Sequence, residues 1–303
     1  MPSLRHHLLT WALPRVLKVR ELDDPERERE RLLRWQGGHP PTLATHLVPR
    51  FEQRFDVEER TLTGPAGASP CWVLTPRGTD PELTLVHVHG GGFTGTIGPW
   101  HVRYAARLAR DLPARVVLPT YPLAPAHSWR DSHGMLADEV ASWVARGRVV
   151  LSGESAGGGI ALALAQTLRD RGGPQPWRLL LTAPWVDLTT STPDTKELDA
   201  YDPWLFIGKL YAYADWWAGS PEDLGRPEVS PALGRLDGLP RALMLCGTRD
   251  LLVPGCRLLA DRAAASDWDL TYLEAPGLLH AFPLLPLIPE ARHAHRHTLE
   301  FLR

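Results

Sequence analysis

The pentapeptide Gly153–Gly157 restricts the fold of this chain most, because it stands between a strand pattern and a helix pattern. Residues 148–152 are mostly apolar and predict a buried strand, and residues 155–170 are rich in Ala and Leu and predict a helix. The pentapeptide has the pattern G-x-S-x-G, and at a junction of strand and helix this pattern predicts a tight turn that holds the Ser155 hydroxyl above the sheet edge. Glycine at both outer positions removes Cβ atoms that would collide where the chain doubles back. We therefore expect Ser155 to be a nucleophile.

Strand and helix patterns alternate from residue 83 onward, which predicts a parallel sheet covered by helices on both faces. Two earlier strands are expected at 55–62 and 71–75, joined by a turn at 63–69, and residues 1 to about 48 are expected to be helical. The later expected strands are 83–88, 115–119, 148–152, 179–182, 242–246 and 270–273, and the later expected helices are 99–111, 131–146, 155–170, 254–266 and 289–302.

A chain of 303 residues could form one large α/β domain or two ordinary ones, and we expect residues 1–303 to form a single unit. The formal net charge of −2 argues against a nucleic acid as the partner. Cys71, Cys246 and Cys256 lack a metal-ligand spacing, so we expect buried thiols, no metal site and a reducing, cytoplasmic location. No stretch approaches the roughly 18 consecutive apolar residues of a membrane-spanning helix.

A serine nucleophile needs a base and a carboxylate that orients the base. His280 is the candidate base, because it alone among the four histidines after Ser155 is expected in a loop that follows a strand. The other three fall in the closing helix, where we expect a solvated face. Asp250 is the candidate acid, because it follows a predicted strand by a short turn. Asp237 precedes that strand and Asp261 falls inside the next predicted helix, so both are weaker candidates.

The segment His89–Phe93 follows the predicted strand 83–88 directly and contains three consecutive glycines. Glycines let the backbone approach a ligand and point N–H groups into a cavity. A dinucleotide fingerprint would need G-x-G-x-x-G before a helix and an acidic residue about 20 positions later, and this chain lacks that pattern. We therefore expect the loop to donate backbone hydrogen bonds to an oxyanion that develops during acyl transfer.

Together these motifs resemble the hormone-sensitive-lipase-like family of α/β-hydrolase carboxylesterases. The resemblance extends from about residue 70 to the end of the chain. It is supported by further matching segments, which are Tyr121–Pro125, Pro184–Leu188, Ser230–Pro231 and Gly277–Phe282. The resemblance implies an α/β-hydrolase fold with a mostly parallel sheet, and it assigns Ser155, Asp250 and His280 to a catalytic triad and the amides of Gly91, Gly92 and Ala156 to the oxyanion hole.

The resemblance also implies a helical cap formed by residues 1–48 and 185–225. The second segment is long and aromatic, and such an insertion in a compact α/β fold is more often functional than idle. Ordinary packing in the cap is the competing interpretation of these aromatic side chains. The candidate substrate-pocket residues are Phe93, Trp204, Phe206, Trp216 and Trp217.

Three positions depart from the family pattern. Pro122 stands where Arg is frequent, Ala126 where Glu is frequent, and Pro254 where a second Asp is frequent. The loop next to the three glycines should therefore be braced differently in this chain. These departures bear on substrate preference more than on the reaction.

The expected reaction is the hydrolysis of short- to medium-chain acyl esters through an acyl-enzyme intermediate, with no cofactor. A lactonase, a deacetylase or an amidase would use the same triad. A non-catalytic small-molecule-binding protein of this fold typically lacks a triad member, whereas all three residues are present here. The expected partner is a small-molecule ester, and a second copy of the chain, in a homodimer, is the other candidate partner.

Overall fold

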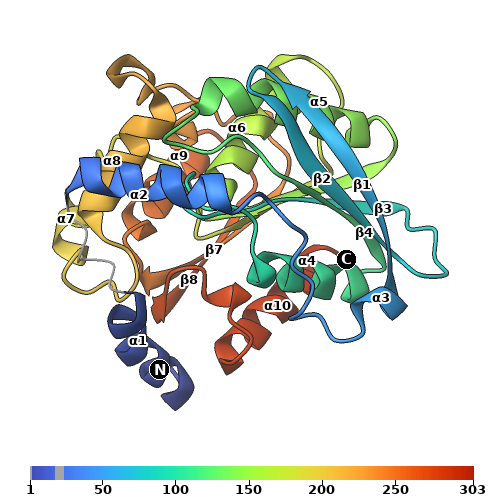
Figure 1. Ribbon diagram of the computed structural model, residues 1–303, viewed down its shortest axis with the longest axis horizontal. Coiled ribbons are helices and arrows are strands. Elements are labelled where there is room, and N and C mark those ends of the chain that lie inside the picture. Colours follow the sequence, from blue (N-terminus) through green and yellow to red (C-terminus); the bar gives the residue numbers. More distant parts are fainter. Residues whose placement is uncertain (1, 18–23) are drawn as a thin grey trace.

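The computed structural model describes residues 2–17 and 24–303, and its centre is an eight-stranded sheet (Figure 1). The strand order is β1-β2-β4-β3-β5-β6-β7-β8. Strand β2 pairs antiparallel with β1 and β4, and all other neighbours are parallel. The strands are β1 (Phe55–Gly64), β2 (Gly67–Pro76), β3 (Leu83–Val88), β4 (Ala114–Pro119), β5 (Arg148–Glu154), β6 (Arg178–Thr182), β7 (Ala242–Arg249) and β8 (Leu270–Leu279).

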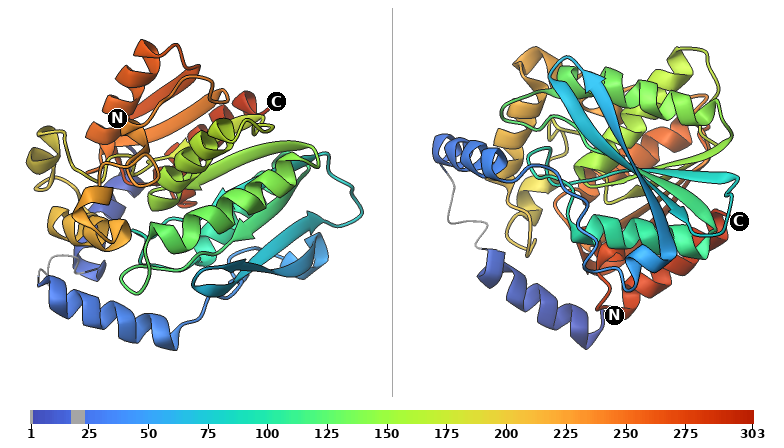
Figure 2. Two further views of the ribbon diagram at one scale, coloured as in Figure 1. Left: turned by 90° about the horizontal axis from the view of Figure 1, so that it is seen from above. Right: turned by 45° about the vertical axis from the view of Figure 1, so that its right-hand side comes forward.

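Helices cover both faces of this twisted sheet (Figures 1 and 2). Side chains alternate across β3, so that Leu85 joins one buried cluster whereas Val86 and Val88 join the other. Each large apolar side chain buried in this way contributes about 1.5–3 kcal/mol. One face carries α4 (Pro99–Asp111) and α10 (Pro289–Phe301), and the other carries α5 (Trp129–Val144), α6 (Ala156–Asp170) and α9 (Val253–Ala265).

The remaining helices come from the N-terminus and from the segment after β6. Helix α2 begins at an N-cap, where the Asp24 carboxylate accepts hydrogen bonds from two backbone N–H groups of the first turn, and Pro25 follows. Of the segment 1–48 that was expected to be helical, residues 1 and 18–23 lie outside the described residues. These helices are α1 (Leu4–Leu17), α2 (Pro25–Gly38), α3 (Phe51–Arg54), α7 (Asp194–Leu198) and α8 (Ile207–Ala218), with 3-10 turns at Pro221–Asp223, Pro231–Leu233 and Phe282–Leu284.

Helices α2, α7 and α8, which we call the cap helices, lie together beyond the sheet (Figure 1). A buried carboxylate joins two of them. Glu28 of α2 accepts a hydrogen bond from the Tyr213 hydroxyl of α8 at 2.6 Å, and Lys209 of α8 lies 3.2 Å from it. Glu28 is 2% exposed, and Arg31 at 2.7 Å, together with Tyr213 and Lys209, lowers its pKa to about 2 against the effect of burial. The two cap helices are therefore joined by a charged network rather than by apolar packing alone.

Three expectations about local structure were wrong. Residues 39–48 are not helical, because α2 ends at Gly38 and two prolines follow His39. Strand β8 continues to Leu279 instead of ending at residue 273, so that residues 274–279 belong to the strand. In α10, His295 is 5% exposed rather than solvated, because its Nε2 lies 2.7 Å from the Asp111 carboxylate of α4.

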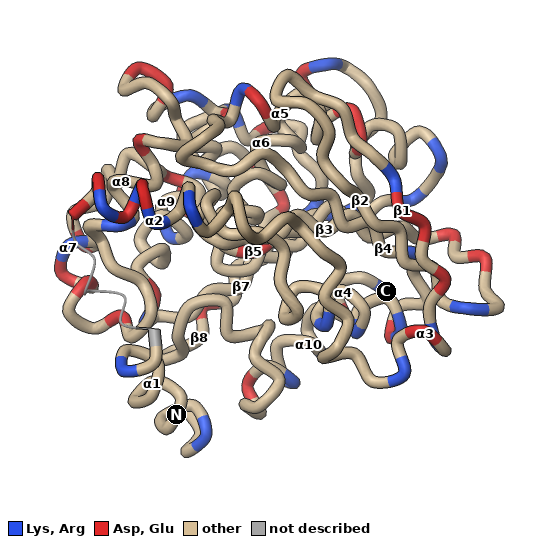
Figure 3. The backbone as a smooth tube through the Cα atoms, in the orientation of Figure 1, with Lys and Arg blue, Asp and Glu red and all other residues tan. Residues whose placement is uncertain are grey.

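Charged residues lie mainly on the outer helices and loops, and both signs follow one another along α2 (Figure 3). This distribution is typical of a surface in contact with water. Cys71 and Cys246 lie in strands and Cys256 in a helix, and all three are buried free thiols, as expected. Every helix within residues 2–17 and 24–303 is too short or too polar to cross a bilayer.

Candidate active site

Ser155 occupies the predicted tight turn between β5 and α6. Its backbone has φ +54° and ψ −126°, a region that L-residues adopt only when their surroundings enforce it. The Ser155 N–H donates to the Thr182 carbonyl at 2.9 Å, and the Ser155 carbonyl accepts from the Trp185 N–H at 2.8 Å. A Cβ atom on Gly153 would lie 2.2 Å from the carbonyl oxygen of Gly157, so the predicted need for glycine is confirmed.

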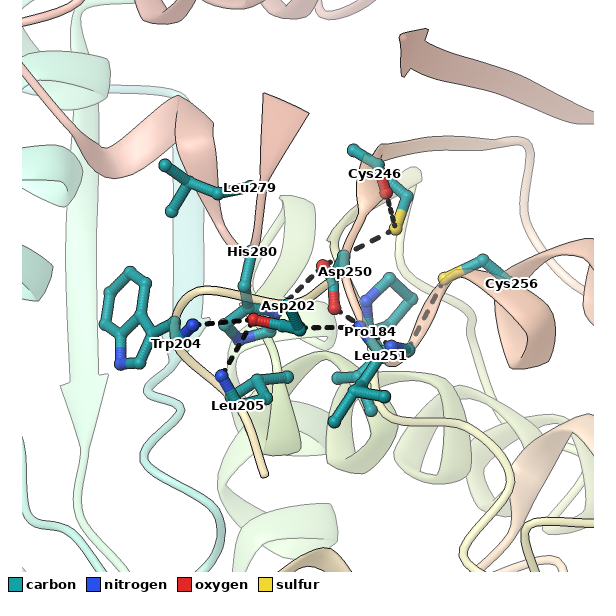
Figure 4. Close-up of polar contacts among 12 residues, drawn as sticks. Pro184, Asp202, Trp204, Leu205, Cys246, Asp250, Leu251, Cys256, Leu279 and His280 are labelled. Carbon is teal, nitrogen blue, oxygen red and sulfur yellow. Dashed lines mark hydrogen bonds and ion pairs between the residues drawn. The ribbon is translucent and has the colours of Figure 1, made fainter. Parts of the chain in front are cut away.

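The candidate base and acid form a buried pair at the ends of β8 and β7 (Figure 4). His280 Nδ1 lies 2.8 Å from Asp250 Oδ2, and the two residues are 4% and 0% exposed. Asp250 Oδ1 accepts a second hydrogen bond from the Leu252 N–H at 2.9 Å. Burial lowers the pKa of His280, but the Asp250 carboxylate more than offsets this, and the net pKa lies above the usual 6.5. The arrangement suits an imidazole that takes up a proton at Nε2.

The sheet topology brings Ser155 to the same edge as this pair. Strands β5, β6, β7 and β8 are parallel neighbours, so their carboxyl ends meet at one edge. Ser155 contacts the end of β6, and Ala183 next to it donates to Leu245 of β7 at 2.6 Å. Within the described residues, Ser155 Oγ makes no hydrogen bond, and thus none to His280. Catalytic hydrogen bonds are often open before substrate binds, so this geometry remains compatible with a triad.

The glycine loop lies directly beside the serine. A Cβ atom on Gly90 would be 3.0 Å from the Ser155 Cβ, and Gly91 has φ +109°, which only glycine adopts readily. Across the part of the chain that the structure describes, the N–H groups of Gly91, Gly92 and Ala156 donate no hydrogen bond. These three amides are therefore available to an oxyanion near the serine.

A buried glutamate holds this loop from below. The Gly90 N–H donates to Glu154 Oε1, and His101 Nε2 lies 3.1 Å from the same oxygen. His87 Nε2 lies 2.9 Å from Glu154 Oε2, and His87 Nδ1 lies 2.7 Å from the Ser152 hydroxyl. Burial raises the pKa of Glu154, but the two imidazoles outweigh it and hold that pKa far below its usual value. The sequence singled out the motif that contains Glu154, yet not this role.

A cap residue braces the other side of the glycine loop. Gln36 Nε2 of α2 donates to the carbonyl oxygens of Thr94 at 2.9 Å and Ala124 at 2.8 Å. The Ala124 N–H in turn donates to the Phe93 carbonyl at 3.0 Å. In this chain, a helix of the cap thus fixes the glycine loop to the loop that contains Pro122.

The aromatic candidates for the substrate pocket lie in three settings. Phe93 and Trp217 are 1% and 2% exposed and stack with ring centroids 4.5 Å apart, so both belong to the core. Trp216 packs beside Tyr213, and Phe206 precedes the first turn of α8. Trp204 meets His280 edge to face, with ring centroids 5.8 Å apart. A role of any of the five in substrate binding stays a prediction.

Sequence reasoning missed Asp202, a cap residue that is 7% exposed. Its carboxylate accepts hydrogen bonds from the N–H groups of Trp204 at 2.7 Å, Leu205 at 2.8 Å and Leu251 at 2.7 Å (Figure 4). The Asp-Pro dipeptide at 202–203 indicates a turn, which the first two bonds confirm. Nothing in the sequence indicates the third bond, because Leu251 is 49 residues away.

An open groove of about 450 Å³ lies elsewhere, at the amino ends of β3 and β5. Its lining includes Asp80, Leu83, Asp111 and Arg148. Because parallel strands share their direction, this edge of the sheet is opposite to the one that carries Ser155. The groove therefore does not belong to the candidate active site.

Comparison with known proteins identifies the fold family of this chain. A family model for the alpha/beta hydrolase fold matches residues 85–284. An acetyl-hydrolase of Streptomyces hygroscopicus is 31% identical over 73% of this chain and 75% of its own length, and the esterase LipI of Mycobacterium tuberculosis is 30% identical over 96% and 91%. A solved esterase of the bacterial hormone-sensitive lipase (HSL) family is 22% identical, has a TM-score of 0.80, and covers 100% of this chain and 98% of its own.

This chain therefore belongs to the α/β-hydrolase fold family. The expected fold class is confirmed, and so is the resemblance to hormone-sensitive-lipase-like esterases. Within that class the chain is a carboxylic ester hydrolase, because relatives that align with most of it are named as an acetyl-hydrolase and an esterase.

Proposed function

We propose that this chain hydrolyses short- to medium-chain acyl esters through a triad of Ser155, His280 and Asp250. The observation that carries the proposal is the buried bond of 2.8 Å between His280 Nδ1 and Asp250 Oδ2. That bond fixes the tautomer in which Nε2 can accept the proton of the serine hydroxyl. The strained turn at Ser155 and its position at the same sheet edge support the assignment.

In the proposed reaction, Ser155 Oγ attacks the ester carbonyl while His280 Nε2 takes the hydroxyl proton. The oxyanion accepts hydrogen bonds from the amides of Gly91, Gly92 and Ala156, and losing one such donor costs about 3–4 kcal/mol of transition-state stabilisation. His280 then protonates the departing alcohol. Water attacks the acyl-enzyme with His280 as the base, which releases the carboxylic acid and restores the serine.

A small acyl group is supported by a relative, the acetyl-hydrolase of Streptomyces hygroscopicus. The aromatic side chains near the site also favour an apolar acyl group, since Trp204 lies against His280. We expect acetate and butyrate esters to be cleaved with a higher kcat/KM than octanoate esters. Matched p-nitrophenyl esters and p-nitroanilides would separate an esterase from an amidase.

We also place the protein in the cytoplasm. Support comes from the buried free thiols of Cys71, Cys246 and Cys256, which is the state that a reducing compartment maintains. Detection of the native protein in a cell fraction outside the cytoplasm would contradict this.

The decisive experiment for the triad is Ser155→Ala, assayed with p-nitrophenyl acetate and with a fluorophosphonate probe. We expect a folded protein that the probe does not label and whose kcat falls by about 10⁴-fold or more. Ser142→Ala is the matched control, because Ser142 lies on α5 and its hydroxyl donates to the Glu139 carbonyl. The control should keep both labelling and turnover. Activity of wild-type size in Ser155→Ala would overturn the proposed function.

A further inference from the structure

The carboxylate of Asp202 joins the cap segment to the loop of the candidate acid (Figure 4). One oxygen, Oδ1, accepts the N–H groups of Trp204 and Leu205 in its own turn. The other, Oδ2, accepts the N–H group of Leu251, the residue that follows Asp250. Both oxygens are used, and the side chain is almost fully buried. Such a carboxylate fixes the relative position of the segments that it joins.

The cap side of this contact leads to His280. The two bonds to Oδ1 set the turn that carries Trp204, and the Trp204 ring meets the imidazole at an interplanar angle of 85°. An edge-to-face contact depends on ring position, so a shift of this turn would move the indole away from the imidazole. Asp202 therefore acts on one face of His280 through its neighbour.

The acid side leads to Asp250. The Leu251 N–H is held by Asp202, and the next N–H, of Leu252, donates to Asp250 Oδ1 at 2.9 Å. A parallel contact supports the alignment, because Arg249 Nε donates to the Tyr201 carbonyl at 2.7 Å. The backbone on both sides of Asp250 is thus bonded to the cap segment at residues 201–202.

We propose that Asp202 is a positioning residue that couples the cap to the acid–base pair, by fixing the Asp250 loop and the Trp204 ring against His280. This inference rests on the proposed function, since it takes Asp250 and His280 as the pair that activates the serine. Besides its hydrogen bonds, Asp202 places a second negative charge near the imidazole. The acidic groups that act on His280 are Asp250, Asp202 and Glu154.

Asp202→Asn is the sharpest test, because it keeps the shape of the side chain. The amide oxygen can still accept the Trp204 and Leu205 N–H groups, but the amide nitrogen would meet the Leu251 N–H donor to donor. Asp202→Ser is a second variant if the first folds poorly. Its hydroxyl can support the local turn, yet it is too short to reach Leu251 and carries no charge.

The matched control is Asp187→Asn. Asp187 is also buried, at 6% exposed, and accepts the N–H groups of Thr189 at 3.0 Å and Ser191 at 2.9 Å. Its hydrogen bonds stay within residues 187–191, so the same substitution tests burial of an aspartate without the contact to the acid loop.

The measurement is kcat/KM for p-nitrophenyl acetate across pH 5 to 9, normalised to sites titrated with a fluorophosphonate. Displacement of reacting groups by a fraction of an ångström to 1 Å lowers rates by roughly 10- to 100-fold, so we expect kcat/KM of Asp202→Asn to fall within that range. Removing a negative charge near His280 also favours its neutral form. The acid limb of the profile should therefore move to lower pH, by up to about one unit. The control should leave the limb in place.

The outcomes separate the two proposals. An unshifted limb and a kcat/KM in Asp202→Asn equal to that of Asp187→Asn would overturn the inference while the triad stands. A shift of the acid limb in Asp202→Asn and Asp202→Ser, with no shift in Asp187→Asn, supports the inference. A loss of stability alone would change the amount of titrated enzyme but would leave the acid limb in place. If Ser155→Ala remains active, the proposed function fails first.

Discussion

Two buried carboxylates flank the candidate active site, Glu154 on the side of the glycine loop and Asp202 on the side of the acid. Both are nearly inaccessible, at 2% and 7% exposed, and both accept a backbone N–H from a loop that carries proposed catalytic groups. They differ in what else they contact. Glu154 faces two imidazoles, those of His87 and His101, whereas Asp202 faces backbone N–H groups and the charge of Asp250.

This difference shows how the partners decide the charge of a buried acid. Burial raises the pKa of both carboxyls. For Glu154 the two imidazoles outweigh burial, and the pKa lies far below its usual range. For Asp202 the charge of Asp250 adds to the effect of burial, the three N–H bonds only partly offset it, and the pKa rises to about 6. The glycine-loop side thus stays ionised, while the acid side titrates at mildly acidic pH.

The largest effect should come from breaking the Glu154 side with Glu154→Gln. This variant removes the anion that the buried His87 and the half-buried His101 contact, and removing one partner from a buried network of this kind costs about 3–5 kcal/mol of the free energy of unfolding. Urea unfolding at pH 7.5 would measure it. Glu30→Gln, at an exposed position on α2 where Arg34 lies 3.4 Å away, is the control and should change stability by about 0.5 kcal/mol or less. A loss below about 1 kcal/mol for Glu154→Gln would show that the partners of Glu154 do not depend on its charge.

A middle-sized effect should appear in the pH dependence of stability at Asp202. Its pKa of about 6 in the folded protein lies above the value of about 4 for an unfolded chain. The folded state therefore binds more protons between these values, and the contribution of this carboxyl is fully present below pH 4 and lost as the pH rises through 6. The difference in unfolding free energy between wild type and Asp202→Asn should fall by roughly 2–3 kcal/mol between pH 4 and pH 7. Urea unfolding at several pH values would detect it, and a constant difference would show that Asp202 is ionised throughout.

The sequence predicted the parts of the site that local patterns specify. Ser155, Asp250 and His280 could be located because each follows a strand, and the structure places all three at the carboxyl edge of the sheet. The contacts of Asp202 and Glu154 could not be predicted, because they join segments that are 49 and 64 residues apart and follow no spacing. The same reason explains why His295 was expected at the surface.

Some errors had a local signal. Helix α2 ends where Gly37–Gly38 and Pro40–Pro41 stand, and these residues already disfavour the helix that we expected up to residue 48. For β8 the strand continues through Pro276 and Gly277, although both residues usually interrupt strands. Strand β8 is at the edge of the sheet, where a missing N–H donor is tolerated, and sheet position is a tertiary property that the sequence does not reveal.

The smallest effect concerns two thiols on the acid side. Cys246 Sγ lies 3.7 Å from Asp250 Oδ2, whereas Cys256 Sγ lies 3.6 Å from the Pro184 carbonyl (Figure 4). Both cysteines are fully buried, so Cys246→Ala and Cys256→Ala should each lower the free energy of unfolding by about 1 kcal/mol.

Only Cys246→Ala removes a donor from the proposed acid. A thiol is a weak donor, so we expect its kcat for p-nitrophenyl acetate to fall by no more than about threefold, with Cys256→Ala unchanged. Equal rates in the two variants would mean that the contact at 3.7 Å does not influence Asp250. Asp250 would then be held by the Leu252 N–H and His280, whereas Glu154 lies between the imidazoles of His87 and His101.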